Sequence, residues 1–123
     1  MVKNGKIVGR GHNRVVAQKD PTMHGEIAAI RDACKNLDTF NLEGCDIYTT
    51  GEPCPMCLGA ILWANIEHVY YGCDRADAGR IGFRDSAFYD VIENGSLPVR
   101  ALDQEECRKL FSDYSQLSGK TPY

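Results

Sequence analysis

Three side chains that commonly bind metals stand near the predicted starts of two helices. His24 comes two residues before Glu26, and Cys54 and Cys57 belong to the segment 52–57, Glu-Pro-Cys-Pro-Met-Cys. A Cys2His set gives zinc three protein ligands and leaves the fourth tetrahedral position for water, as in catalytic zinc sites. Glu26 is placed to take a proton from that water and pass it to a leaving group. Together these residues predict a catalytic zinc site.

Each of these residues also has an ordinary interpretation. His24 alone is a polar residue at a helix start, and Glu26 alone is an acid that suits the positive end of a helix. A lone C-x-x-C serves structural zinc or redox chemistry as well. A redox module would need a reversible disulfide between its two cysteines. A structural zinc site would need a fourth protein ligand, for which the candidates are His12, His68 and the four other cysteines.

The elements that must position these residues follow from turn signals and periodicity. Asn4-Gly5 predicts a hairpin, Thr22 is the expected N-cap of the His24 helix, and Pro55 suits the first position of the next helix with Cys54 as its cap. Polar connections are expected over 11–20 and 73–82. The expected strands are Val2–Lys3, Lys6–Arg10, Asp46–Thr50, Glu67–Gly72 and Leu97–Leu102, and the expected helices are His24–Leu37, Pro55–Asn65, Phe83–Glu93 and Gln104–Leu117. This alternation predicts a single α/β domain over residues 1–123.

Composition narrows the class of protein. A chain of 123 residues, 43% of them hydrophobic, is long enough to fold as one domain without disulfides. No apolar run approaches the ~20 residues of a membrane span and no signal peptide is evident, so a cytoplasmic protein is expected. The net charge is −3, and the acidic residues of segment 103–113 argue against nucleic acid as the partner.

Cysteine spacing separates the six cysteines into two groups. Cys54 and Cys57 are expected to bind zinc. The other four stand singly among apolar or helix-forming neighbours and are expected to be small buried hydrophobic residues: Cys34, Cys45, Cys73 and Cys107. A disulfide framework is therefore not expected.

From Gly5 to about Tyr89 the chain resembles the cytidine deaminase-like zinc hydrolases, in the branch that holds bacterial guanine deaminases and tRNA adenosine deaminases. The resemblance rests on Gly-His-Asn at 11–13, His-Gly-Glu at 24–26 and the segment Pro53–Ile61, which match the H-x-E…P-C-x-x-C signature of zinc deaminases. It implies a three-layer α/β/α sandwich with a mixed central sheet, zinc on the three ligands and Glu26 as proton shuttle. Because the chain begins at Met1, the family's N-terminal helix and most of its first strand are expected to be missing, and a dimer is expected to hold the shortened domain together.

The resemblance also implies substrate contacts. Asn13 matches an amide that hydrogen-bonds the base, and Gly25 stands where alanine is usual in the purine branch. The segments Asp74–Gly79 and Gly82–Ser86 look like guanine deaminases, in which an aspartate and a C-terminal tyrosine close over the purine; here these would be Asp85 and Tyr123. Their ordinary interpretations are a turn asparagine, a helix-start aspartate and a frayed terminus. Trp63 is expected near the site or, more simply, in the core.

The leading functional hypothesis is hydrolytic deamination of guanine to xanthine and ammonia, in which zinc-bound water attacks the amino-bearing carbon and Glu26 shuttles protons. A free purine base or nucleoside is the expected substrate, and a homodimer that exchanges C-terminal segments is the expected assembly. The alternatives are an adenosine- or cytosine-type deaminase, a tRNA adenosine deaminase, and a non-catalytic zinc-binding or redox C-x-x-C module.

Overall fold

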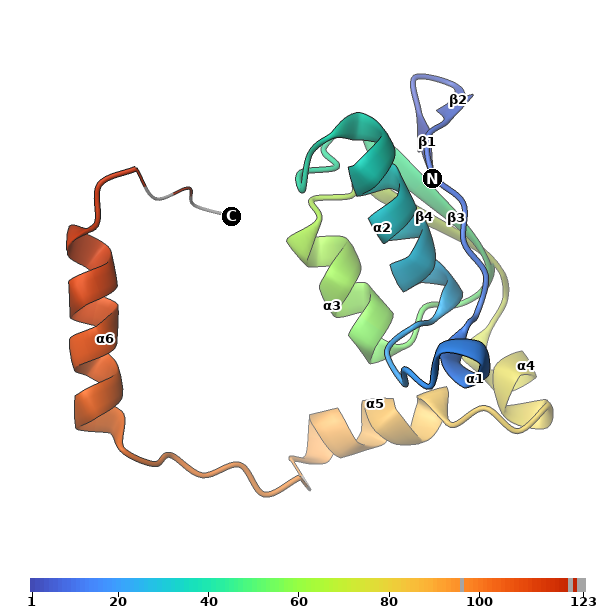
Figure 1. The fold of residues 1–123 in the computed structure, drawn as a ribbon. Helices are drawn as coiled ribbons and strands as arrows, with labels where there is room; N and C mark the ends of the chain where they lie inside the picture. Colours follow the sequence, from blue (N-terminus) through green and yellow to red (C-terminus); the bar gives the residue numbers. More distant parts are fainter. Residues whose placement is uncertain (96, 120, 122–123) are drawn as a thin grey trace.

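A mixed four-stranded sheet forms the centre of the fold (Figure 1). The computed structural model describes residues 1–95, 97–119 and 121. The strands lie in the order β2-β1-β3-β4, where β1 is Val2–Lys3, β2 is Lys6–Ile7, β3 is Cys45–Gly51 and β4 is His68–Cys73. β1 pairs antiparallel with β2 and β3, whereas β3 and β4 are parallel. The mixed sheet and its helices confirm the predicted α/β class.

The predicted hairpin forms between β1 and β2. Asn4 and Gly5 have φ angles of 50° and 73°, the left-handed values that a tight two-residue hairpin turn requires. Val2 pairs with Ile7 of the hairpin and with Asp46 of β3, so the hairpin is joined directly to the long central strand.

Two helices cover one face of this sheet. α2 (Gly25–Leu37) and α3 (Pro55–Trp63) contact each other, and α2 packs on β3. The buried core between these helices and the sheet consists of Met1, Ala29, Ala33, Leu42, Cys45, Ile47, Ile61, Ala64 and Ile66. Small residues on α2, including Ala29 and Ala33, let it lie close to the sheet. The packing of α2 and α3 on the sheet sets the positions of their N-terminal ends, where the candidate ligands lie.

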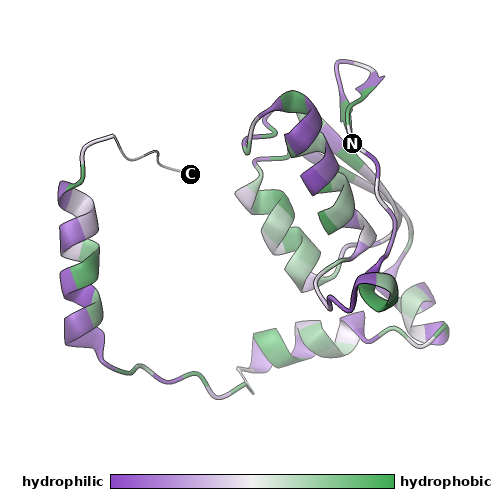
Figure 2. Ribbon diagram, in the orientation of Figure 1, coloured by the Kyte–Doolittle hydropathy of each residue, from purple (hydrophilic) through white to green (hydrophobic). Residues whose placement is uncertain are grey.

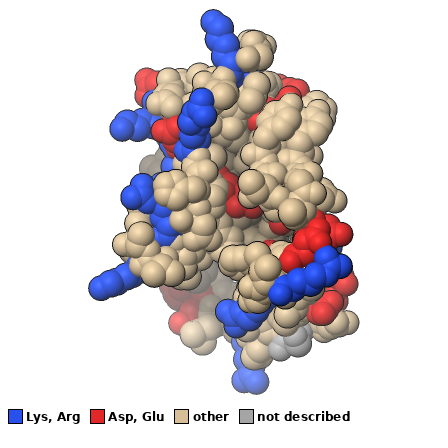
Figure 3. Space-filling view, turned by 90° about the vertical axis from the view of Figure 1, so that its right-hand side faces the viewer, with Lys and Arg blue, Asp and Glu red and all other residues tan. Residues whose placement is uncertain are grey.

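The opposite face of the sheet is open. Tyr48 and Tyr70 stack there with ring centroids 4.7 Å apart, and both side chains are about half exposed. Figure 3 looks onto the side of the molecule that lies at the right in Figure 1, where uncharged side chains occupy much of the middle and Lys and Arg lie toward the margins. Of the two helical layers expected, the described part of the chain therefore places one over the sheet.

The remaining helices follow β4 or precede α2. They are α1 (Val15–Gln18), α4 (Arg75–Arg80), α5 (Asp85–Asn94) and α6 (Gln104–Gln116). α1 and α4 lie in segments where the sequence predicted only polar connections. α4 forms because Asp74 and Asp77 make a capping box, in which each side chain accepts a hydrogen bond from the other residue's backbone N–H.

Other local predictions were also wrong. Thr22 does not cap α2; its backbone N–H and hydroxyl donate to Asp20 at 2.8 and 2.6 Å, and His24 is the N-cap. Cys73 and Cys107 are exposed rather than buried. The segment predicted as a strand over Leu97–Leu102 contains no strand, because the chain there has left the sheet and has no neighbour to pair with.

The C-terminal helix α6 stands apart from the rest of the described chain, beyond the connection 95–103 (Figure 1). In Figure 2 the ribbon of α6 alternates between hydrophobic and hydrophilic residues. The hydrophobic ones are all exposed: Cys107, Leu110, Phe111, Tyr114 and Leu117. None of the helices in the described part of the chain combines the length and hydrophobicity needed to cross a membrane.

Candidate metal centre

Two of the predicted metal ligands occupy the N-cap positions of neighbouring helices. His24 caps α2 with φ −68° and ψ 164°, and Cys54 caps α3 with φ −68° and ψ 168°. In both cases the chain arrives extended and turns into a helix, so the two side chains project from the same end of the helical layer. His24 Nδ1 and Cys54 Sγ are 3.6 Å apart. Cys57 joins them from the first turn of α3.

This donor set fits a zinc ion. The nitrogen of His24 and the sulfurs of Cys54 and Cys57 all lie within 4.8 Å of one another, and both cysteines are buried. Zinc–sulfur and zinc–nitrogen bonds of about 2.3 and 2.0 Å hold tetrahedral ligand atoms at separations of this size. Among the described residues this group has three members and no fourth protein donor. Three ligands with one open position is the composition of a catalytic rather than a structural zinc site.

The two thiols have opposite electrostatic surroundings. The pKa of Cys54 is lowered to about 6, chiefly because the Cys57 thiol donates a hydrogen bond to it, with further help from the backbone N–H groups of Cys57 and Met56 and from His24. The pKa of Cys57 is raised by that same hydrogen bond, by burial and by the charge of Glu26. The surroundings therefore favour the thiolate form of Cys54 and the thiol form of Cys57, and binding a metal through both sulfurs requires both to be deprotonated.

Glu26 faces this cluster from the first turn of α2. Its carboxylate is close enough to Cys57 to hydrogen-bond the thiol and to raise its pKa. The structure thus brings together all four residues that the sequence assigned to zinc and proton transfer.

Asn13 and Gly25 are also neighbours. A Cβ at Gly25 would lie 3.6 Å from the backbone nitrogen of Asn13, which is ordinary van der Waals contact, so the site has room for the alanine usual in the purine branch. The Asn13 Oδ1 accepts a hydrogen bond from the Val15 backbone N–H at 3.1 Å. Asn13 is otherwise exposed beside the start of α2, with its amide N–H groups available to a ligand.

The other predicted substrate residues are placed differently. Asp85 begins α5, a helix that contacts α3. Trp63 ends α3, about 12 Å along the helix from the cysteines, and its side chain is 68% exposed. It therefore lies neither in the core nor beside the metal centre of its own chain, because α3 directs its two ends to opposite sides of the molecule. Tyr123 lies outside the described residues.

Glu52, Arg75 and Tyr89 approach the metal centre although sequence reasoning did not single them out. Arg75 hydrogen-bonds Glu52, and the Tyr89 hydroxyl donates to the Pro53 carbonyl at 2.9 Å. These hydrogen bonds from Arg75 hold the pKa of the Glu52 carboxyl below its usual range. The one local signal was Glu52, a charged residue directly before Pro53-Cys54. Arg75 and Tyr89 come from later elements, and nothing in the sequence indicates that they lie beside it.

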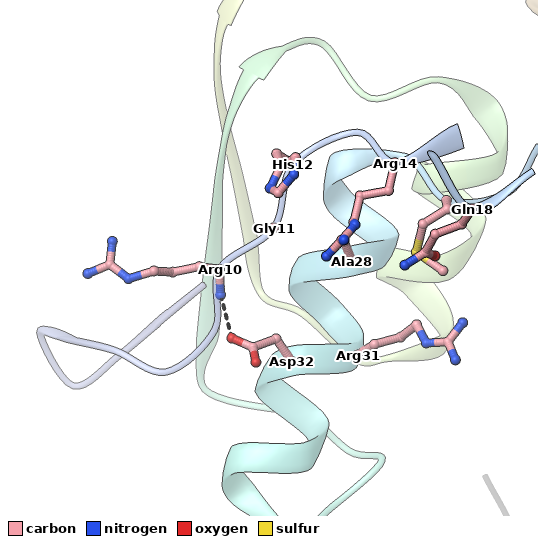
Figure 4. Close-up of a pocket in the computed structure, with 9 residues that line it drawn as sticks. Arg10, Gly11, His12, Arg14, Gln18, Ala28, Arg31 and Asp32 are labelled. Atoms are coloured by element: carbon pink, nitrogen blue, oxygen red, sulfur yellow. Dashed lines mark hydrogen bonds between the residues drawn. The ribbon is translucent and has the colours of Figure 1, made fainter. Parts of the chain in front are cut away.

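A shallow pocket of about 360 Å³ lies beside the start of α2 but includes none of the zinc ligands (Figure 4). Arg10, Arg14 and Arg31 contribute to its lining. In Figure 4 the side chains of Arg10 and Arg31 extend away from it, and that of Arg14 extends toward Ala28. The pocket is therefore not part of the metal centre. We call its three arginines, Arg10, Arg14 and Arg31, the basic rim.

The family of the chain follows from its matches to known proteins. The family described as the cytidine and deoxycytidylate deaminase zinc-binding region matches residues 1–73, which include all three candidate ligands and Glu26. The chain belongs to this deaminase family. It is a hydrolytic enzyme of the kind that cleaves carbon–nitrogen bonds. Its family has zinc as cofactor, and its His-Cys-Cys group has the donors to hold that metal.

Two relatives show how far the similarity extends. The chain is 40% identical to the guanine deaminase of Bacillus subtilis over 127 aligned residues, which cover 100% of this chain and 81% of that protein. It is 39% identical to a tRNA-specific adenosine deaminase of Haemophilus influenzae, covering 89% of this chain and 64% of that protein. Guanine and tRNA deaminases are thus both relatives of this chain.

Solved structures match this chain over different lengths. The crystal structure of the Bacillus subtilis guanine deaminase superposes with a TM-score of 0.91 at 40% identity, covering 99% of this chain and 80% of that one. A structure from a study of tRNA:A34 deaminases superposes with a TM-score of 0.58 at 45% identity, covering 59% of this chain and 53% of that one. The superposition on the guanine deaminase therefore includes the outlying C-terminal helix.

Proposed function

We propose that this enzyme hydrolyses guanine to xanthine and ammonia. The observation that carries the proposal is the superposition of 99% of the chain on a guanine deaminase, because it extends beyond the shared zinc centre. It takes in α4, α5 and α6, the part of the chain that holds Asp85. We also propose that residues 1–123 act as one deaminase domain.

The reaction replaces the amino group on a ring carbon by oxygen from water. The carbon–nitrogen bond to the amino group breaks, a carbon–oxygen bond to water forms, and the nitrogen leaves as ammonia after gaining a proton. Glu26 is the group that removes a proton from the attacking water and returns it to the departing nitrogen. Its place at the start of α2, next to Cys57, puts the carboxylate at the metal centre.

His24, Cys54 and Cys57 would hold zinc, which would supply a Lewis acid and lower the pKa of a water molecule there toward about 7. The chain's other residues orient the base. Asn13, beside Gly25, offers amide N–H groups to the base, while its oxygen stays with Val15. Asp85 approaches from α5 and is proposed to accept hydrogen bonds from the purine.

The test is a substrate panel with ammonia release as the readout. Zinc-loaded protein is given guanine, adenine, cytosine, their nucleosides, and tRNA. We expect ammonia from guanine, and a Glu26→Gln variant that keeps one zinc per chain but loses at least about 10²-fold in kcat. Glu43→Gln, an exposed carboxylate distant from the ligands, is the matched control and should retain full activity. Ammonia release by Glu26→Gln at the normal rate would refute the assigned role.

A tRNA substrate is the second candidate, and the basic rim gives it some support. Arg10, Arg14 and Arg31 contribute to the lining of the pocket beside the start of α2, and their side chains could contact phosphates near a base that enters the site. Deamination of tRNA adenosine without deamination of guanine in the same panel would select this alternative. In that case Arg14→Gln should weaken tRNA deamination at low salt, and its deficit relative to wild type should become smaller as salt concentration increases.

We further propose that two copies associate and exchange their C-terminal segments. The apolar residues of α6 are exposed, and Tyr48 and Tyr70 are about half exposed on the sheet. β4 is an edge strand of the sheet that the described residues form, and Leu97 and Val99 are exposed. A second copy would cover these surfaces, and it would bring Tyr123 to the partner's site. All six cysteines are free thiols, which suits the proposed cytoplasmic location.

A further inference from the structure

The segment that carries Cys54 is held by side chains from two later elements. Glu52 stands two residues before Cys54, and its side chain is 15% exposed. Both of its oxygens accept hydrogen bonds from Arg75, the first residue of α4. The backbone N–H of Arg75 donates to Oε2 at 3.0 Å, and its Nε and Nη2 donate to Oε1 at 3.1 and 2.7 Å. A sheltered carboxylate bound in this way is tightly oriented.

Arg75 is itself covered by Tyr89 of α5. The guanidinium carbon lies 4.1 Å from the centre of the Tyr89 ring, the geometry of a cation–π contact. The Tyr89 hydroxyl then donates to the Pro53 carbonyl oxygen at 2.9 Å. The chain of contacts therefore starts at Glu52, passes through Arg75 and Tyr89, and returns to the residue next to Glu52.

This closed set acts on the peptide that carries a metal ligand. The Pro53 carbonyl belongs to the peptide unit that leads into Cys54, so holding its oxygen sets the plane of that peptide and the direction of the cysteine side chain. The Pro53 side chain is fully buried, and the Glu52 backbone N–H donates to the Cys73 carbonyl at 2.8 Å. Cys54 has no side-chain capping bond of its own to hold it in place.

We propose that Glu52, Arg75 and Tyr89 are positioning residues that hold Cys54 in its zinc-binding conformation. Partners that orient a metal ligand commonly change metal affinity when they are removed. The same contacts tie α5 to the metal segment, and Asp85 lies one helical turn before Tyr89. The proposal rests on the zinc centre of the proposed function, not on guanine as its substrate.

The test measures zinc retention in four single variants and one double variant. Glu52→Gln and Arg75→Gln remove one charge from the pair, and Tyr89→Phe removes a single oxygen while keeping the ring. Arg80→Gln is the matched control, because Arg80 lies on the same helix and pairs with Asp77 at the surface. Zinc-loaded proteins are mixed with a chromogenic chelator, and the rate of zinc release is followed. Melting temperatures are measured with and without zinc.

Zinc release should be about 10- to 100-fold faster in Glu52→Gln and Arg75→Gln, a few-fold faster in Tyr89→Phe, and unchanged in the control. The double variant Glu52→Gln/Arg75→Gln should release zinc about as fast as either single variant, since both break the same contact. The increase in melting temperature that zinc produces should be smaller in these variants. A residue that only stabilises the fold would lower both melting temperatures equally, and that result would overturn the proposal.

Wild-type release rates in folded Tyr89→Phe and Glu52→Gln would overturn it as well. Should Arg75→Gln fail to fold, Tyr89→Phe still decides the matter, because it removes one hydrogen bond and leaves the cation–π contact. Zinc release requires no substrate. If guanine is not deaminated, the zinc-release result still tests the positioning residues. If zinc release is unchanged, the guanine assay still tests the proposed substrate.

Discussion

His24 and Cys54 are both N-cap residues with nearly the same backbone conformation. Each is the last extended residue before a helix, and the two sets of backbone angles agree within a few degrees. An N-cap residue is held by the hydrogen bonds of the helix that follows it, so its side chain starts from a fixed point. The positive ends of both helices also favour the thiolate of Cys54. The ligand positions and the helix starts are therefore one structural feature.

At the residue scale, Asn13 offers a test that separates substrate binding from turn structure. Asn13→Asp keeps an oxygen that accepts the Val15 N–H but replaces the amide donor by an acceptor. If the amide donates to the base, KM should increase about 3- to 10-fold or more, while the melting temperature stays within about 2 °C of wild type. Steady-state kinetics and thermal melts measure the two effects. An unchanged KM would leave Asn13 as a turn residue only.

At the element scale, the close approach of the segment 9–13 to α2 depends on glycine. A Cβ at Gly11 would lie 2.4 Å from the Ala29 backbone nitrogen and 2.5 Å from the Gly25 carbonyl oxygen. These are backbone atoms of α2 and cannot move aside without shifting the helix. The segment that carries His12 and Asn13 can therefore lie on α2 only while residue 11 has no side chain.

Replacement of Gly11 by alanine should destabilise the protein by about 1–3 kcal/mol or more, since the added carbon overlaps backbone. Gly59→Ala is the matched control, because nothing lies within 4 Å of a Cβ there. On helix α3 that change should leave stability unchanged or improve it by up to about 1 kcal/mol. Urea denaturation of both variants gives the two free energies of unfolding. Equal values would show that the segment does not pack on α2 as described.

Elements were predictable where local chemistry determines them. Asn4-Gly5 specified the hairpin, and Pro55 specified the start of α3 with Cys54 as its cap. The ligands were predicted from residue types and spacing, whereas the expected cap of α2 was wrong by two residues. The strand expected over Leu97–Leu102 did not form, because a strand exists only with a neighbour and the chain there has left the sheet. Trp63 was misplaced for a related reason: a hydrophobic residue enters a core only if the fold turns its helix face inward.

At the scale of the whole molecule, contacts between residues distant in sequence decide whether one chain makes a complete site. The contacts of Arg75 with Glu52 and of Tyr89 with Pro53 join residues 23 and 36 positions apart, and no local signal announces them. The C-terminal helix presents the larger case. Its hydrophobic residues have helical spacing that predicts burial, yet they are exposed in the single chain. These hydrophobic residues become buried only if another surface covers α6.

Exchange of C-terminal segments predicts that inactive chains can complement each other. A Glu26→Gln chain lacks its proton shuttle but supplies Tyr123, and a Tyr123→Ala chain lacks the tyrosine but keeps Glu26. Each variant alone should be inactive or strongly impaired. If Tyr123 completes the partner's site, unfolding and refolding the two together should restore guanine deamination to about a quarter of the wild-type rate, since half of random dimers are mixed and each has one complete site. Leu110→Asp in both chains should abolish this recovery, because it places a charge among the exposed hydrophobic residues of α6. Ser112→Asp, on the polar side of the same helix, should preserve it. A site completed within one chain predicts no recovery, and sedimentation at the 13.7 kDa mass of one chain would contradict the dimer itself.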